Sequence, residues 1–290
     1  MRVVYFADTI RLGGAERVLA DLARAAVAAG HHTIVLAPQP YLVEELAAVV
    51  PGADVRRFGD DAFRTAPTLV ARGRSLLGQM PALVRAMRAL RPDVLHVSNG
   101  GHPGSGLCCM ALPAARLARV PRRILSVHAA PRPRDESQVQ VQVAIDRLVW
   151  SSAQTVVGAT AIVGERLRSE RGMPAGVYVR IPYGVARPRG GDRAAARAAH
   201  GIGADEPLVL MAAASSDEQK GHAVLVEALA GAAGVRCLMV GAPPPPAALR
   251  RAAALGLGRR LVVAGRVPEL GPLLSAADGV VVPAVADESL

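Results

Sequence analysis

Short apolar segments alternate with helical patterns from the start of the chain. Residues 3–6 form an apolar run, and Val18, Leu19 and Leu22 then recur at helical spacing until Gly30. A second apolar run covers residues 32–37. This strand–loop–helix–strand order predicts the opening of a doubly wound parallel sheet.

The same alternation continues to residue 181. Strands are predicted over residues 55–58, 93–97, 124–128, 155–158 and 178–181, and helices over 68–90, 107–117, 139–151 and 161–171. Pro81 lies inside the first of these helices, and proline removes a helical hydrogen bond, so we expect an interruption there.

The pattern breaks over residues 184–206, which are rich in Pro, Gly and charge and contain a short Ala/Arg helix. It then restarts with strands over 208–212, 236–240, 261–264 and 279–282, and helices over 223–230, 243–255 and 270–275. We predict an N-terminal domain over 1–186, a linker over 187–206 and a second domain over 207–290. The last strand is followed by no helix, so we expect the second domain to be incomplete.

Composition places the chain among globular proteins. Apolar residues make up 51% of it and charged residues 20%, with no apolar run long enough to span a bilayer. The chain opens directly on a strand, which favours a cytoplasmic protein. Three cysteines without metal-binding spacing, Cys108, Cys109 and Cys237, are expected to be buried apolar residues in a reducing compartment.

Charge is unevenly distributed. Residues 1–190 contain 25 arginines and 14 acidic residues, whereas residues 191–290 contain 9 basic and 10 acidic residues. The first half should therefore meet something anionic. Aromatic residues are only 3% and provide no stacking platform, so a membrane surface or an anionic acceptor fits better than nucleic acid.

One lysine, Lys220, stands among 33 arginines. Either it has survived a compositional bias by chance, or it holds a position where a compact ammonium is needed. The pair Gly13-Gly14 lies between the first strand and the first helix. It is either a tight turn or a phosphate site at a helix N-terminus, and the absence of G-x-G-x-x-G disfavours a dinucleotide oxidoreductase.

Several motifs in sequence order resemble the retaining GT-B glycosyltransferases of family 4 (glycosyl transferases group 1). They are GGAERVL with GHHTIV near the start, PDVLH, SVH, IPYGV in place of IPNGV, QKG in place of EKG, and VVAGRV followed by LLSAAD and VP. Glu288 resembles the first Glu of the family's E-x7-E signature. The resemblance spans residues 3–290 and implies two Rossmann-like α/β domains facing a cleft.

The resemblance also implies a donor site. Lys220 would bind the diphosphate, with Gly13, Gly14, Ser215, Gly265 and Arg266 as further donor-binding residues and Glu288 at the sugar hydroxyls. Ser215 stands where the family commonly has an arginine, so leaving-group stabilisation would be weaker or come from elsewhere. No D-x-D motif is present, which agrees with the metal independence of this class; no metal or cofactor is expected.

Three histidines come near predicted strand ends. The resemblance places His128 beside the donor sugar as an orienting and catalytic group, together with Lys220 and Glu288; the alternative is a histidine packed at a strand end. His96 could be functional or packed. His102 lies in a Gly-rich loop and is expected to face solvent.

The predicted helix ending near Arg91 has five arginines beside its apolar stripe. It could lie on an anionic bilayer at the inner face of the membrane, or its stripe could pack in the core below a solvated arginine face.

We therefore expect a hexosyltransferase using a UDP- or GDP-sugar donor and a glycan or lipid-linked acceptor in cell-surface or polysaccharide biosynthesis. The alternative is a truncated, non-catalytic remnant with partial donor binding, and an epimerase of the same fold is disfavoured by the motifs.

Overall fold

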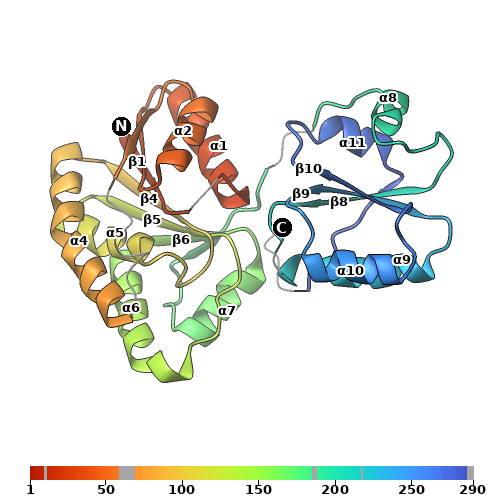
Figure 1. The fold of residues 1–290 in the computed structure, drawn as a ribbon. Coiled ribbons are helices and arrows are strands. Elements are labelled where there is room, and N and C mark those ends of the chain that lie inside the picture. Colours follow the sequence, from red (N-terminus) through yellow and green to blue (C-terminus); the bar gives the residue numbers. More distant parts are fainter. Residues whose placement is uncertain (10–11, 59–68, 185–187, 217, 286–290) are drawn as a thin grey trace. The chain divides into compact units, whose positions relative to one another are not determined.

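The computed structural model describes residues 1–9, 12–58, 69–184, 188–216 and 218–285, and their side chains except those of 69–77. The chain folds into two compact units that divide between Tyr183 and Gly184. Each unit contains one parallel sheet with helices on both faces, as the alternating pattern predicted (Figure 1).

The first unit is built on a seven-stranded sheet of order β3-β2-β1-β4-β5-β6-β7. Its strands are β1 (Arg2–Ala7), β2 (His32–Ala37), β3 (Asp54–Arg57), β4 (Val94–Asn99), β5 (Arg122–Val127), β6 (Thr155–Gly158) and β7 (Tyr178–Arg180). Its helices are α1 (Gly14–Ala28), α2 (Pro40–Val49), α4 (Leu69–Leu90), α5 (Gly106–Leu117), α6 (Val139–Ser152) and α7 (Ala161–Arg171).

Strand alternation divides the core of this unit into two layers. In β1, Val4 and Phe6 pack with α4, α5, α6 and α7, whereas Val3, Tyr5 and Ala7 pack with α1 and α2. Figure 1 shows where these helices lie around the sheet. Because side chains of successive strand residues point to opposite faces, both faces of the central strands are apolar and the strands read as continuous apolar runs.

Helix α4 continues through Pro81, so the predicted interruption is wrong. Pro81 is exposed, while Leu83 and Met87 on the same helix are buried in the core. Packing of that apolar stripe holds the helix across the hydrogen bond that proline cannot make.

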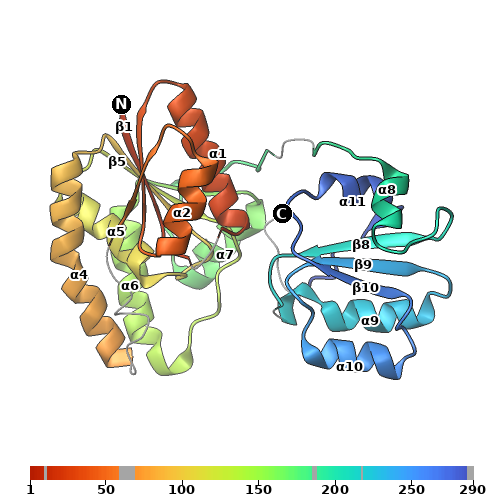
Figure 2. The same cartoon turned by 45° about the horizontal axis from the view of Figure 1, so that its top comes forward.

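The second unit has a four-stranded sheet of order β10-β9-β8-β11, with the strands β8 (Leu208–Ala213), β9 (Arg236–Gly241), β10 (Leu261–Gly265) and β11 (Gly279–Val280). Helices α9 (His222–Gly231) and α10 (Pro246–Ala254) cover one face, and α8 (Arg193–Ala198) and α11 (Gly271–Ala276) cover the other (Figure 2).

The segment predicted as a linker contributes to this second unit. Asp192 caps α8, and the Arg197 side chain is 2% exposed. Arg197 donates to the carbonyls of Gly203 and Ala276 and pairs with Asp278. Through Arg197, residues 192–206 are thus hydrogen-bonded to the rest of the second unit. The change in composition that suggested a linker marks the boundary between the two units.

The three cysteines Cys108, Cys109 and Cys237 are buried and unpaired, as predicted. Burial raises the pKa of the Cys109 and Cys237 thiols to about 12.

Candidate functional site

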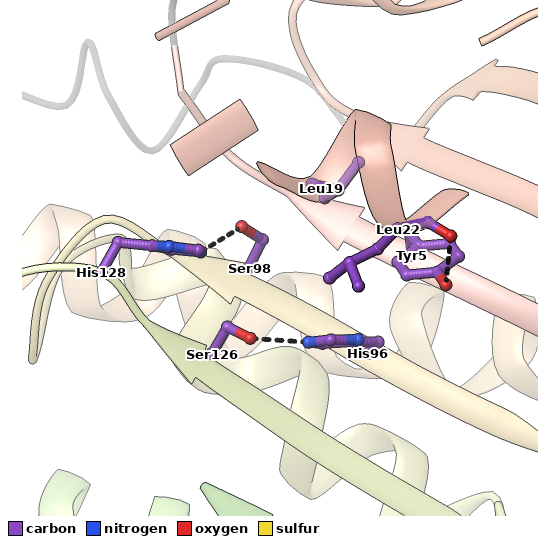
Figure 3. Close-up of a pocket in the computed structure, with 7 residues that line it drawn as sticks. All are labelled: Tyr5, Leu19, Leu22, His96, Ser98, Ser126 and His128. Carbon is purple, nitrogen blue, oxygen red and sulfur yellow. Dashed lines mark hydrogen bonds between the residues drawn. The ribbon is translucent and has the colours of Figure 1, made fainter. Parts of the chain in front are cut away.

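A polar cluster lies at the carboxyl edge of the first sheet, on the face covered by α1. His96 and Ser98 come from β4, and Ser126 from β5 with His128 directly after it (Figure 3). These four residues alternate with buried Leu and Val that face the other layer, which is why they gather on one face. Ligands of open α/β sheets bind at this edge.

Two histidine–serine pairs cross between the strands. The Nε2 atom of His96 lies 2.7 Å from Ser126 Oγ, and that of His128 lies 2.9 Å from Ser98 Oγ (Figure 3). The Tyr5 ring packs against His96 with centroids 5.5 Å apart. The hollow between these side chains has no room for a water molecule, so the cluster is a packed element of the edge.

His128 uses both ring nitrogens. Its Nδ1 atom is hydrogen-bonded to the Tyr183 hydroxyl and its Nε2 to Ser98, and it is 8% exposed. Burial lowers the pKa of His128 to about 4 and raises that of Tyr183 to about 12. At neutral pH the ring is therefore uncharged, so one nitrogen donates and the other accepts. A sugar hydroxyl reaching this ring has to replace one of the two partners.

Acid should destabilise the first unit through these histidines. Burial lowers the pKa of His96, as of His128, from 6.5 in the unfolded chain to about 4. The unfolded chain then binds more protons between these values, so stability decreases as the pH falls through this window. We expect a loss of about 2 kcal/mol between roughly pH 7 and 5.5, measured by urea unfolding. His128→Gln should make the pH dependence of stability shallower, whereas His31→Gln should leave it as in wild type. If the urea midpoint of wild type is the same at pH 7 and pH 5.5, the expectation is wrong.

The glycine turn before α1 already has carboxylate partners. The Gly13 amide donates to Glu16 Oε2 at 2.9 Å, and the Leu12 amide donates to Glu45 Oε2 at 2.7 Å. Glu16 is 3% exposed, and a Cβ on Gly14 would meet nothing within 4 Å. A diphosphate at Gly13 would have to displace a carboxylate, so at that residue the structure has the features of a tight, self-capped turn.

In the second unit, the predicted donor residues lie at the carboxyl edge of the sheet. Ser215 and Lys220 are in the segment between β8 and α9, with Lys220 half-buried in a 3₁₀ turn (Glu218–Lys220). Gly265 ends β10, and Arg266 donates from Nη2 to the Ala214 carbonyl at 3.2 Å. The Arg266 side chain therefore crosses the end of β9 to the segment that carries Ser215.

The residue after Lys220, Gly221, stands where the backbone conformation and a close neighbour both require glycine. It has a φ of +68°, and a Cβ there would lie 1.8 Å from the Pro283 carbonyl oxygen. Val285 donates its amide to the Gln219 carbonyl at 2.9 Å, so residues 283–285 run beside the Lys220 turn. Glu288 lies outside the described residues.

His102 is buried at 0% exposure, so the expectation that it faces solvent is wrong. Its Nε2 atom lies 2.7 Å from Asp146 Oδ1, and its ring packs on Trp150. Asp146 also pairs with Arg171 and Arg134. Through His102, the Gly-rich loop after β4 is thus held by an ion-pair cluster that was not predicted.

The described residues contain no group of three or more His, Cys, Asp or Glu side chains placed to hold a metal ion. Within the same residues, no helix combines the length and apolar character needed to cross a membrane.

Two Rossmann-like units, each with a parallel sheet, define a GT-B architecture, and solved structures share it. HepE from Anabaena in complex with UDP superposes with a TM-score of 0.75 at 17% identity, over 99% of this chain and 75% of HepE. Sucrose-phosphate synthase from Thermosynechococcus elongatus superposes with a TM-score of 0.70 at 21% identity, over 100% of this chain and 77% of the synthase. WaaG, a glycosyltransferase involved in lipopolysaccharide biosynthesis, superposes with a TM-score of 0.68 at 15% identity, over 97% of this chain and 75% of WaaG. At these identities the likeness shows the fold.

Sequence profiles identify the family. The profile described as glycosyl transferase 4-like domain matches residues 13–184, and that of glycosyl transferases group 1 matches residues 206–290. The first match covers more than half of the chain, so the chain belongs to the glycosyl transferase 4-like family. A comparison with curated proteins gave no match.

Proposed function

We propose that the chain transfers a hexose from a UDP- or GDP-sugar to a glycan or lipid-linked acceptor, with retention at the anomeric carbon. The observation that carries the proposal is the presence of two cationic residues, Lys220 and Arg266, at the same sheet edge, where such folds bind ligands. HepE, which shares the fold, has been solved with UDP and with UDP-glucose.

The chemistry requires stabilisation of a diphosphate leaving group as the bond to the sugar breaks. In the proposal the Lys220 ammonium and the Arg266 guanidinium supply that positive charge. The hydrogen bond from Arg266 to the Ala214 carbonyl holds the guanidinium group near Ser215. Arg266 would therefore supply part of the positive charge that the family's arginine provides at the position of Ser215. We propose no metal or cofactor.

His128 would orient the donor as a neutral hydrogen-bonding group. Its low pKa supports this role over that of a proton donor, because the ring remains uncharged at neutral pH. Tyr183 and Ser98 hold the plane of the ring before the donor binds, and the donor hydroxyl would then replace one of these two partners. Glu288 would bind sugar hydroxyls.

The acceptor side is assigned to the basic first unit, working in the cytoplasm at the inner face of the membrane. Arg85 and Arg88 of α4 are exposed, while Leu83 and Met87 are buried. A bilayer contact through this part of α4 would therefore be electrostatic and sensitive to salt.

The test is release of nucleotide from a set of UDP- and GDP-hexoses in the presence of candidate acceptors. We expect one donor to turn over, and the proton coupling at the anomeric carbon should show the donor's own configuration in the product. Inversion would contradict the retaining mechanism. Nucleotide binding without turnover for every donor would instead favour the non-catalytic alternative.

A further inference from the structure

Two arginines adopt a backbone conformation that, among the other described residues, occurs only at glycine. Arg91, which follows α4, has a φ of +45°, and Arg119, after α5, has a φ of +61°. Within the described ranges they are the two non-glycine residues with positive φ. Side chains with a Cβ are disfavoured in this conformation, and glycine is the usual residue after a helix.

Three other helices of the chain follow the usual rule. Glycines with positive φ stand directly after or within two residues of the ends of α1, α7 and α10, at Gly30, Gly172 and Gly256. The strain at Arg91 and Arg119 is thus confined to two helix ends, and both line the same hollow. Backbone strain that persists at one place is a reason to look for a function there.

The hollow lies at the amino edge of the first sheet, between the ends of α4 and α5. Its volume is about 300 Å³, and the buried Met87, Pro92 and Val120 supply apolar lining. It is at the opposite end of the strands from His128. Six strand residues at about 3.3 Å each separate the two edges by about 20 Å, so a small molecule cannot occupy both.

Three guanidinium groups at the hollow have no partner among the residues that the structure describes. Arg88, Arg91 and Arg119 are exposed, and none forms a hydrogen bond or ion pair through its side chain within the described part of the chain. In contrast, Arg2 donates to the Leu90 carbonyl at 2.6 Å. The three are therefore available to a ligand.

The charge of the hollow is positive. Among its described lining residues one is acidic, Asp93, which accepts a hydrogen bond from the Arg2 amide at 2.7 Å. Guanidinium groups bind phosphate oxygens in a bidentate manner, and phosphate esters and diphosphates carry two or more negative charges. The apolar lining leaves room for a carbon-containing portion.

We propose that Arg88, Arg91 and Arg119 form a binding site for a phosphate or diphosphate group on a small organic molecule, separate from the proposed donor site. The backbone strain at Arg91 and Arg119 is retained because the site needs their guanidinium groups.

The proposal is tested with the full chain and inorganic pyrophosphate as the probe, by titration calorimetry. The double variant Arg91→Gly/Arg119→Gly should weaken the binding at this site about 10-fold or more. It should also melt ~2 °C or more above wild type, because glycine relieves both strained positions. Any pyrophosphate bound near Lys220 is the same in both proteins and does not enter the difference.

Arg147→Ala serves as the matched control, since Arg147 is an exposed arginine on α6 outside the hollow; it should bind pyrophosphate as wild type does. Equal binding by wild type and the double variant would overturn the proposal. A lower melting temperature of the double variant would also overturn it, because the arginines would then be holding the fold.

The source of the phosphate is distinguished with phosphatidylglycerol vesicles and neutral phosphatidylcholine vesicles. Flotation with anionic vesicles that depends on Arg91 and Arg119 would support the site and assign it to a lipid headgroup. Loss of pyrophosphate binding in the double variant with unchanged flotation would support a soluble ligand.

Discussion

Replacing Asp146 with alanine should lower the free energy of unfolding by about 3–5 kcal/mol. The Asp146 side chain is 2% exposed and accepts hydrogen bonds from His102 at 2.7 Å and Arg171 at 3.0 Å. The Arg171 side chain is fully buried, so removal of the carboxylate leaves an uncompensated charge in the core. Chemical unfolding monitored through Trp150, which packs against His102, measures the loss directly.

Two further variants separate charge from packing. Asp146→Asn keeps the shape of the side chain but not its charge, so it should retain most of the destabilisation if the buried Arg171 is the cause. Asp21→Ala removes an exposed carboxylate that pairs with Arg24 and should change stability by less than about 1 kcal/mol. If Asp146→Ala unfolds within about 1 kcal/mol of wild type, the cluster does not contribute as described.

The contacts of this cluster could not be predicted from the sequence. His102 was expected in solvent because glycines surround it, and local composition is the only information a single loop carries. Its partner Asp146 is 44 residues away, and Arg171 is 25 residues beyond that. Such contacts depend on how α6 and α7 pack beneath the loop, which periodicity alone does not specify.

The residues that gather at the carboxyl edges of the sheets were easier to predict from the sequence. Parallel strands end at the same edge, so the order of elements alone brings His96 and His128 together and places Lys220 with Arg266 in the second unit. Ser98 and Ser126 were missed, although a signal was present. The mirrored strings His96-Val97-Ser98 and Ser126-Val127-His128 put both polar pairs on one face of neighbouring strands.

Helix α2 was missed for a different reason. Pro40 at its first turn and the spacing of Leu42 and Leu46 are helix signals, and both leucines are fully buried. The segment is ten residues long and lies between two predicted strands, so its short helical pattern was not recognised. Its helicity is set by packing of two leucines, which a short periodic window does not resolve.

Replacing Lys220 with alanine should lower kcat/KM about 10²–10³-fold with the donor found to turn over. This follows from the proposed role of its ammonium in stabilising the diphosphate as it leaves. An interaction that strengthens in the transition state affects kcat, so kcat should decrease more than KM increases. Steady-state assays of nucleotide release give both constants. Arg250→Ala, which removes an exposed cation from α10 in the same unit, should leave both unchanged.

Lys220→Arg separates charge from geometry and is the sharper variant. The chain has 33 arginines and one lysine, so a site that needed only positive charge could have used either residue. A guanidinium is planar and larger than an ammonium, and the turn before Gly221 has little freedom because Pro283 blocks any Cβ there. Lys220→Arg should therefore recover only part of the activity lost in Lys220→Ala. Full activity of both variants would mean that leaving-group charge is stabilised elsewhere and that the lysine persists by chance.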